Sequence, residues 1–318
     1  MAEIKGRVCV TGAGGFVGSW LVKLLLSKGY VVHGTVREPS DPKYAHLWKL
    51  DKAAENLKVF KADLIDYQSI STAFEGCTGV FHVASPVPSS SVPNPEKELI
   101  EPAVKGTLNV LKACSEAKVN RLVVVSSVAA VTANPAWPTG QVKDESCWSD
   151  TDHCRKTENW YMASKTEAEQ LAFDYAKNSG LDVVTICPAL VLGPVLQSTI
   201  NASSLVLTKL LKGVECVENT ERMIVDVRDL AEALLLLYEK PEAQGRYICL
   251  SYAIRVQELV EKLKSMYPNY KYPTIFKEVE LPGRVSSEKL QKLGWTYRPL
   301  EETLADSIES YKQVGFLD

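Results

Sequence analysis

Residues 8–20 read Val8-Cys-Val-Thr-Gly-Ala-Gly-Gly-Phe-Val-Gly-Ser-Trp20, and this stretch decides the fold. An apolar run ends in glycines at 12, 14, 15 and 18, and a helical pattern follows directly, which predicts a strand, a tight turn and a helix. Glycine lets backbone N–H groups come close to a pyrophosphate, whose charge then lies at the helix N-terminus. A plain tight turn is the alternative, but the setting between a strand and a helix favours dinucleotide binding. The spacing Gly12-x-x-Gly15-x-x-Gly18 indicates a subclass, because Val17 stands where ordinary Rossmann dehydrogenases have a third glycine.

The composition is that of a globular chain of enzyme size. Its 318 residues are 46% apolar, so one large domain or two closely packed domains can bury a sizeable core. Lys and Arg number 36 against 39 Asp and Glu, so we expect neither nucleic acid nor an anionic membrane as a partner. No apolar run approaches the ~18 residues of a membrane span and no signal peptide fits, so we expect a cytoplasmic protein. The eight cysteines lack the spacings of zinc sites, and we expect buried thiols and no bound metal.

The residue that follows the second predicted strand, over residues 31–36, bears on the cofactor. NAD enzymes place an acidic residue there to bind the adenosine ribose hydroxyls, whereas this chain has Arg37. A guanidinium can stack on adenine and pair with a 2′-phosphate, and Lys43 is close enough to add a second cation, unless it is a solvated loop charge. The pattern predicts NADP(H), and the neighbouring Glu38 runs against it.

Strands and helices continue to alternate up to residue 125. Further strands are predicted over residues 57–60, 79–83 and 121–125, and a helix over about residues 102–117. Alternation of this kind predicts an α/β fold with a Rossmann-type, doubly wound parallel sheet.

Two strand ends are candidate cofactor contacts. Asp63 and Leu64 close the third strand, where an adenine edge can meet a carboxylate and an apolar side chain, although Asp63 is equally suited to cap the next helix. Ala84 and Ser85 follow the fourth strand as a small-residue turn that lets a nicotinamide ribose approach. His82, inside that strand, is expected to be a core histidine.

The catalytic candidates lie on the fifth strand and on the helix that comes later. Ser126 and Ser127 end the strand at the sheet edge where such folds place ligands, although two hydroxyls there can be plain turn residues. Tyr161 and Lys165 are four residues apart, so on a helix they share one face. We expect the Lys165 ammonium to favour ionisation of the Tyr161 phenol and so to create a proton donor usable near neutral pH.

Together these motifs resemble an extended short-chain dehydrogenase/reductase. Residues 144–150, 159–161, 187–194 and 225–231 resemble the plant cinnamoyl-CoA reductase and dihydroflavonol reductase group within that superfamily. The resemblance implies NADPH/NADP+, a phenylpropanoid or related aromatic carbonyl substrate, and catalysis by Ser127, Tyr161 and Lys165. It also implies cofactor contacts by Gly12, Gly15, Phe16, Val17, Gly18, Arg37, Lys43, Asp63, Leu64, Val83, Ala84, Ser85, Tyr161, Lys165, Pro188, Ala189, Val191 and Ser203.

The chain departs from this group at positions that bear on the substrate. Cinnamoyl-CoA reductases carry a Cys one residue after the catalytic Tyr, where this chain has Met162, so Cys154 lacks the partner of a redox switch. They also carry a His and an Arg that grip coenzyme A, where this chain has Val206 and Val256, although Lys209 is retained. Thr132 replaces an Asn of the dihydroflavonol reductases.

We therefore expect reduction of a free hydroxycinnamaldehyde-type aldehyde, as in the cinnamyl-alcohol-dehydrogenase-like members of the group, which points to phenylpropanoid and lignin biosynthesis. The alternatives are a cinnamoyl-CoA reductase or another phenylpropanoid or polyketide ketone reductase of the group, an epimerase or dehydratase that retains its nicotinamide, and a non-catalytic NADP sensor.

Two lobes are predicted, the second of them discontinuous. Residues 1–187 and 223–246 form the NADP-binding lobe, in which residues 223–238 are expected to return to the sheet as a strand and a helix. Residues 188–222 and 247–318 form the smaller substrate lobe, which prolines divide into short pieces. We expect a monomer.

Overall fold

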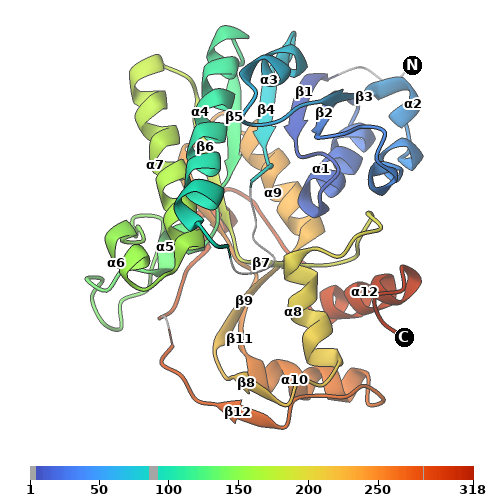
Figure 1. Ribbon diagram of the computed structural model, residues 1–318, viewed down its shortest axis with the longest axis vertical. Coiled ribbons are helices and arrows are strands. Elements are labelled where there is room, and N and C mark those ends of the chain that lie inside the picture. The colour runs from blue at the N-terminus through green and yellow to red at the C-terminus, as the bar shows by residue number, and fades with distance from the viewer. Residues whose placement is uncertain (1–4, 86–91, 282) are drawn as a thin grey trace.

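The computed structural model describes residues 5–85, 92–281 and 283–318. Its core is a seven-stranded sheet of order β10-β6-β5-β4-β1-β2-β3, in which every neighbouring pair is parallel (Figure 1). This is the predicted α/β fold with a doubly wound sheet. The strands are β1 (Gly6–Thr11), β2 (Tyr30–Val36), β3 (Leu57–Lys61), β4 (Gly79–His82), β5 (Arg121–Val125), β6 (Val183–Pro188) and β10 (Gly245–Cys249).

Helices cover both faces of this sheet because its strands alternate their buried side chains between two hydrophobic clusters. Val8 and Val10 of β1 face the cluster that includes α1 and α9, whereas Cys9 faces the cluster that includes α3, α4 and α7. The same alternation separates Phe81 from Val80 in β4. The covering helices are α1 (Phe16–Ser27) and α9 (Val227–Glu239) on one side, and α3 (Tyr67–Phe74), α4 (Glu101–Glu116) and α7 (Trp160–Ser179) on the other.

A second lobe lies below the carboxyl edge of the sheet in Figure 1. It holds a three-stranded sheet of order β11-β9-β7 and a two-stranded parallel sheet of β12 and β8. Its strands are β7 (Leu190–Leu192), β8 (Cys216–Glu218), β9 (Glu221–Asp226), β11 (Tyr252–Arg255) and β12 (Ile275–Lys277), and its helices are α8 (Ala202–Leu211), α10 (Val256–Met266), α11 (Glu288–Lys292) and α12 (Leu300–Gln313). The short helices α2 (Ala53–Asn56), α5 (Ala129–Thr132) and α6 (Thr151–Lys156) belong to connections of the first lobe.

The path of the chain between the lobes differs in two respects from the prediction. Residues 221–226 do form a strand before a helix, but β9 pairs with β7 and β11 in the small sheet, and only α9 packs on the large one. Strand β10 runs to Cys249 in the large sheet, so the predicted boundary at residue 246 falls inside a strand. Both differences concern which strands pair over long distances, which local sequence patterns do not encode. The assignment of NADP binding to the first lobe and of substrate binding to the second stays a prediction.

Two predictions about single residues also need correction. Asp66 caps α3 by accepting hydrogen bonds from the Gln68 and Ser69 N–H groups, so Asp63 is not the helix cap. Seven of the eight cysteines are buried thiols as expected, but Cys216 is exposed because β8 lies at the surface in a two-stranded sheet. Cys154 is buried and packs in one small cluster with Ala163 and Met162.

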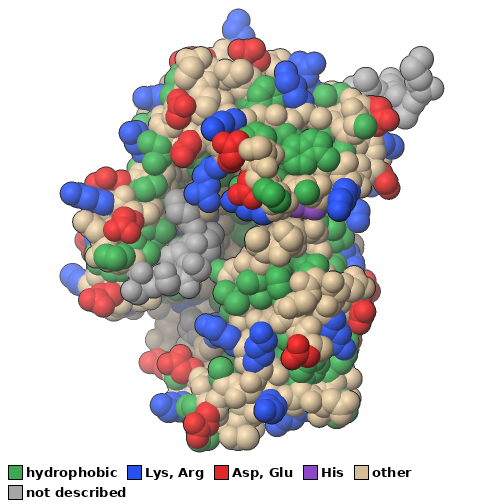
Figure 2. All heavy atoms as spheres, turned by 45° about the vertical axis from the view of Figure 1, so that its right-hand side comes forward, with side chains coloured by type: hydrophobic (Ala, Val, Ile, Leu, Met, Phe, Trp, Pro, Cys, Tyr) green, Lys and Arg blue, Asp and Glu red, His purple; other side chains and the backbone are tan. Residues whose placement is uncertain are grey.

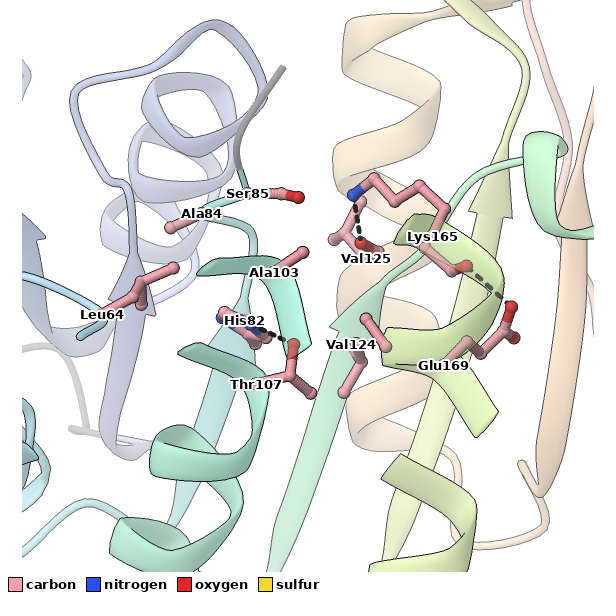
Figure 3. Close-up of a pocket in the computed structure, with 12 residues that line it drawn as sticks. Leu64, His82, Ala84, Ser85, Ala103, Thr107, Val124, Val125, Lys165 and Glu169 are labelled. Atoms are coloured by element: carbon pink, nitrogen blue, oxygen red, sulfur yellow. Dashed lines mark hydrogen bonds between the residues drawn. The ribbon is translucent and has the colours of Figure 1, made fainter. Parts of the chain in front are cut away.

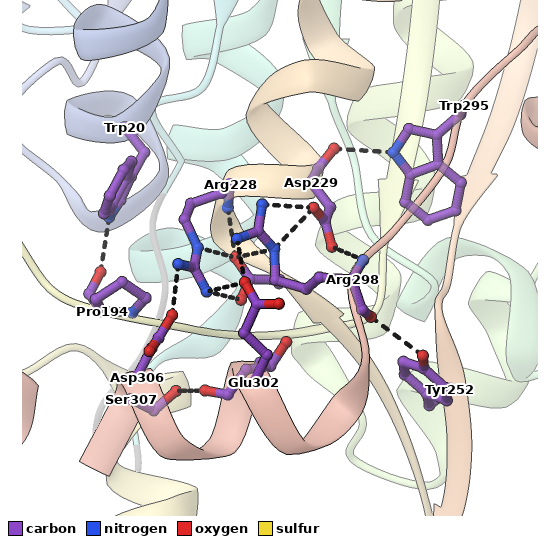
Figure 4. Close-up of polar contacts among 12 residues, drawn as sticks. Trp20, Pro194, Arg228, Asp229, Tyr252, Trp295, Arg298, Glu302, Asp306 and Ser307 are labelled. Carbon is purple, nitrogen blue, oxygen red and sulfur yellow. Dashed lines mark hydrogen bonds and ion pairs between the residues drawn. The ribbon is translucent and has the colours of Figure 1, made fainter. Parts of the chain in front are cut away.

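An ion-pair cluster joins the lobes near the start of α9 (Figure 4). The Asp226 carboxylate, fully buried, pairs with Arg228 at 2.8 Å, and Arg228 reaches Asp306 of α12 at 2.6 Å. Arg298 pairs with Asp229 at 2.9 Å. Because buried carboxylates require charged partners, this cluster fixes α12 against α9.

On the face shown in Figure 2, acidic and basic side chains are interspersed over both lobes. Among the described residues, no helix combines the length and the apolar character needed to cross a bilayer.

Candidate active site

The glycine loop between β1 and α1 provides the clearest binding feature. Gly15 is the N-cap of α1, and the first turn has neither a side-chain cap nor an acidic residue, so its N–H groups are available to an anion. Gly12 has φ +66°, and a Cβ on Gly18 would lie 2.2 Å from the Gly12 carbonyl oxygen. The loop therefore requires glycine at both positions; binding of a pyrophosphate there stays a prediction. Phe16 and Val17 form the first residues of α1 beside it.

A hydrogen-bonded chain fixes the turn after β4. Thr11 Oγ1 accepts hydrogen bonds from the N–H groups of Val83 and Ala84, each at 3.1 Å, so the Thr11 hydroxyl proton is left to donate to His82 Nδ1 at 3.0 Å. His82 Nε2 then carries the proton and faces Thr107 Oγ1 at 3.4 Å. Burial, followed by the nearby Lys165 charge, lowers the His82 pKa to about 3. The prediction of a satisfied core histidine is confirmed.

The predicted NADP determinants lie around the end of β2. Arg37 follows β2 and is exposed, and within the described part of the chain its guanidinium makes no hydrogen bond or ion pair. Glu38, whose negative charge argues against a nearby 2′-phosphate, pairs with Lys61, with 2.7 Å between Oε2 and Nζ. Lys43 is paired with Asp41 at 2.7 Å, so its charge is already partly neutralised.

The catalytic candidates meet at the carboxyl edge of the sheet. Ser127 comes two residues after the end of β5, and its Oγ accepts a hydrogen bond from the N–H of Ala129 at 3.1 Å. Tyr161 and Lys165 lie on the first two turns of α7, with Lys165 Nζ 6.0 Å from the centre of the Tyr161 ring. Lys165 Nζ also donates to the Val125 carbonyl at 3.4 Å.

The protonation of this group differs from the prediction. Burial raises the pKa of Tyr161, and hydrogen bonding to Ser127 offsets this only in part, so the phenol keeps its proton at neutral pH. We expected Lys165 to lower the Tyr161 pKa, but its ammonium lies beside the ring, and burial lowers its own pKa to about 8. A protonated phenol is nevertheless the form that a proton donor requires.

A pocket between α4, α7 and the ends of β4 and β5 brings several predicted residues together (Figure 3). Ser85 and Lys165 extend toward each other from opposite walls at its rim, and His82 and Thr107 lie deeper. Leu64 and Ala84 also line it. The residues predicted for a nicotinamide ribose thus surround one hollow beside the catalytic group.

The remaining predicted contacts are spread along the chain that enters the second lobe. Pro188 ends β6 at the same sheet edge, and its carbonyl accepts a hydrogen bond from Val128 N–H at 3.0 Å. Ala189 follows directly and Val191 lies in β7. Ser203, in the first turn of α8, accepts a hydrogen bond from Asn201 at 2.6 Å. No bound molecule tests these contacts, which stay predictions.

A buried charge network that the sequence did not predict lies behind the helix of Tyr161 and Lys165. Glu169 of α7 is fully buried and accepts hydrogen bonds from Ser126 and Arg246. Its position four residues after Lys165 was a usable signal, since it places a second charged group on the same helix face. Arg246 gave no such signal, because β10 reaches the site only through the sheet.

Comparison with known proteins agrees with the fold and gives the family. The model of the NAD dependent epimerase/dehydratase family matches residues 8–249. The chain is 47% identical to cinnamoyl-CoA reductase 1 of Petunia hybrida, over 100% of this chain and 96% of that one. The crystal structure of vestitone reductase from alfalfa (Medicago sativa) matches with a TM-score of 0.86 at 34% identity, covering 98% of this chain and all of the other. The NADPH complex of Gre2 from Candida albicans matches with a TM-score of 0.84 at 28% identity, covering 98% and 99%.

Proposed function

The chain belongs to the NAD dependent epimerase/dehydratase family, within its cinnamoyl-CoA reductase and dihydroflavonol reductase group, and from that premise we propose that it is an NADPH-dependent reductase of aromatic aldehydes. Its membership makes it an NAD(P)-dependent oxidoreductase of the extended short-chain type. The preference for NADPH, the aldehyde and the roles of single residues are the proposal. We place its substrates among hydroxycinnamaldehydes and its products among the corresponding alcohols.

Arg37 supports NADPH over NADH. It stands at the end of β2, where an NAD enzyme needs a hydroxyl acceptor, and the neighbouring Glu38 is turned to Lys61 and Ser40. An exposed guanidinium that has no partner among the described residues suits a 2′-phosphate, which it can bind through two parallel hydrogen bonds. The Lys43–Asp41 pair makes Lys43 the weaker contributor.

Tyr161, Ser127 and Lys165 each have a separate role in the proposed reaction. When bound, NADPH supplies the hydride to the carbonyl carbon. The Tyr161 hydroxyl gives its proton to the carbonyl oxygen, and Ser127 donates a hydrogen bond to the same oxygen, so that the developing negative charge is stabilised. Lys165, which lies at the pocket rim opposite Ser85, would hold the ribose hydroxyls of the bound cofactor.

The residues at the start of α10 favour an aldehyde substrate over a coenzyme A thioester. Val256 is 2% exposed and packs in the core with Leu259 and Val260, so it offers nothing to an anionic coenzyme A tail. Arg255, the adjacent cation, is paired with Glu278 and also donates to the Asn219 carbonyl at 3.1 Å. A flat aromatic aldehyde needs only an apolar slot with a few polar groups.

Cinnamoyl-CoA thioester reduction is the second candidate, and a specific observation favours it. The relative at 47% identity over the full chain carries that activity in its name, and this likeness supports the thioester better than the aldehyde. Lys209 on α8 is exposed and can meet a phosphate.

The deciding experiment measures kcat/KM for coniferaldehyde and for feruloyl-CoA with NADPH. We expect the aldehyde to be preferred at least about tenfold, which corresponds to about 1.4 kcal/mol. The reverse order would assign the protein to the thioester reductases. A mock purification from cells that do not express the protein is the control for reduction by contaminating enzymes. An as-purified absorbance spectrum showing tightly held nicotinamide would instead favour an epimerase.

A further inference from the structure

The carboxylate of Glu169 has four partners in the interior of the first lobe. Its Oε2 accepts a hydrogen bond from Ser126 Oγ at 2.7 Å, and its Oε1 accepts one from Thr185 Oγ1 at 2.5 Å. Arg246 binds both oxygens, at 2.9 Å through Nε and 3.1 Å through Nη2, and the Cys187 thiol lies 3.5 Å from Oε1. The carboxylate therefore joins α7 to the residue that follows β5 and to strands β6 and β10.

The guanidinium of Arg246 is equally well bound. Besides Glu169 it donates to the backbone carbonyls of Glu145 at 3.1 Å, Cys147 at 2.8 Å and Ala130 at 3.2 Å, and it lies 3.4 Å from the centre of the Trp148 ring. Its side chain is 6% exposed and that of Glu169 is 0% exposed. A buried ion pair gains stability only when its remaining hydrogen bonds are made, as they are here.

The Glu169–Arg246 ion pair contacts residues on both sides of Ser127 in the sequence. Glu169 accepts a hydrogen bond from the hydroxyl of Ser126, the residue before Ser127. Arg246 donates to the carbonyl of Ala130 in the short helix α5, and the N–H of Ala129 in that helix donates to Ser127 Oγ. Glu169 itself belongs to α7, the helix that carries Tyr161 and Lys165. One buried contact thus links the segment of the serine to the helix of the other two catalytic residues.

We propose that Glu169 and Arg246 are positioning residues, which set the Ser127 hydroxyl and the Tyr161–Lys165 helix face in register for proton transfer. The proposal rests on the reductase function proposed above, but not on the choice of carbonyl substrate. Misplacement of a reacting group by about 1 Å can cost about 100-fold in rate, so a contact that fixes this register has a direct effect on turnover.

The charges around Lys165 provide a readout beyond turnover. Its neighbours are Glu169 on the same helix, Cys187 of β6, His82 of β4 and the Tyr161 ring, with Arg246 behind Glu169. The Glu169 charge favours the protonated amine. Loss of that charge should therefore let Lys165 lose its proton at lower pH and move the alkaline limb of the pH–kcat profile in the same direction.

The experiment compares Glu169→Gln with Glu167→Gln. Glu167 is two residues earlier on α7 and also pairs with an arginine, Arg155, but at the partly exposed outer side of the helix. For Glu169→Gln we expect kcat lower by about 10- to 100-fold, an NADPH dissociation constant within about twofold of the wild type, and the alkaline limb at lower pH. Glu167→Gln should match the wild type in all three. A Glu169→Gln enzyme with wild-type kcat and pH profile would overturn the proposal.

Ser126→Ala covers the case in which Glu169→Gln does not fold. It keeps the ion pair and removes only the hydroxyl that links Glu169 to the segment of Ser127. We expect a lower kcat with unchanged NADPH affinity and an unchanged pH limb; wild-type kcat in this variant would overturn the proposal.

The substrate does not confound this test. Each variant is compared with the wild type on whichever carbonyl the wild type reduces, aldehyde or thioester. A wild type that reduces only thioesters would refute the aldehyde proposal. The positioning roles would still be decided by the kcat of each variant relative to the wild type, measured with the thioester.

Discussion

The Tyr44 ring occupies the space into which a side chain on Gly14 would project: a Cβ there would lie 2.1 Å from Tyr44 Cδ1. Tyr44 is 9% exposed, and Lys43 Nζ lies 4.9 Å from the centre of its ring. Gly14 therefore makes room for the Tyr44 ring, in the segment that carries Lys43. Gly15, by contrast, is exposed at the helix N-terminus.

Gly14→Ala should destabilise the fold by about 1 to 3 kcal/mol, because the added methyl group must displace a packed ring. The measurement is urea unfolding of this variant, of Tyr44→Leu and of the double variant. Once the ring is removed, Gly14→Ala should have almost no further effect, so the double variant should be destabilised by less than the sum of the two single variants. Gly15→Ala is the control, since its Cβ meets only the Gly12 carbonyl oxygen, at 3.3 Å, and should cost less. Additive effects of the two substitutions would contradict the packing explanation.

Arg37→Ala should weaken NADPH binding by about tenfold or more and leave NADH binding nearly unchanged, because a charge-assisted hydrogen bond contributes about 1.5 to 3 kcal/mol. Fluorescence titration with both cofactors checks this. Lys5→Ala controls for general charge, since Lys5 pairs with Glu239 before the amino end of β1 and should affect neither cofactor. An equal loss with NADPH and NADH would refute the role of Arg37.

Tyr161→Phe should lower kcat by about 100- to 10,000-fold, because it removes the proton donor and keeps the ring. Ser127→Ala should cost less, about 10- to 100-fold, since it removes one hydrogen bond to the carbonyl oxygen but leaves the donor. Pre-steady-state oxidation of NADPH measures both without interference from product release. Near-normal hydride transfer in Tyr161→Phe would exclude the mechanism.

The parts of the site that the sequence predicts are those encoded locally. The glycine loop, the strand-end Ser127 and the spacing of Tyr161 and Lys165 each depend on a few adjacent residues. The structure brings Ser127, Tyr161 and Lys165 to one edge of the sheet. What the sequence could not provide depends on packing between distant segments. Tyr44 behind Gly14 and Arg246 behind Glu169 are such cases, because each pair is 30 or more residues apart and carries no shared periodicity.

The raised Tyr161 pKa has the same origin. Adjacent charges can be inferred from a spacing of four residues, whereas desolvation depends on how completely other segments cover the site. Burial acts on Tyr161 and Lys165 together, and it favours the neutral form of both. The spacing of Tyr161 and Lys165 therefore does not give the direction of the Tyr161 pKa shift, because burial by distant segments decides it.

The same burial means that Lys165 should destabilise the folded protein at neutral pH. Its pKa falls from 10.5 to about 8 on folding, so between these values the unfolded chain binds more protons, and the free energy of unfolding rises with pH. Below pH 8 the protonated, buried amine costs about 3 kcal/mol at 1.36 kcal/mol per pKa unit. Lys165→Met should therefore be more stable than the wild type at pH 7, and the difference should shrink as the pH rises toward 10, although turnover is lost. Urea unfolding of both proteins at pH 7 and pH 9.5 tests this. A Lys165→Met variant less stable than the wild type at pH 7 would contradict the prediction and show that the amine is held by contacts stronger than its 3.4 Å hydrogen bond to the Val125 carbonyl.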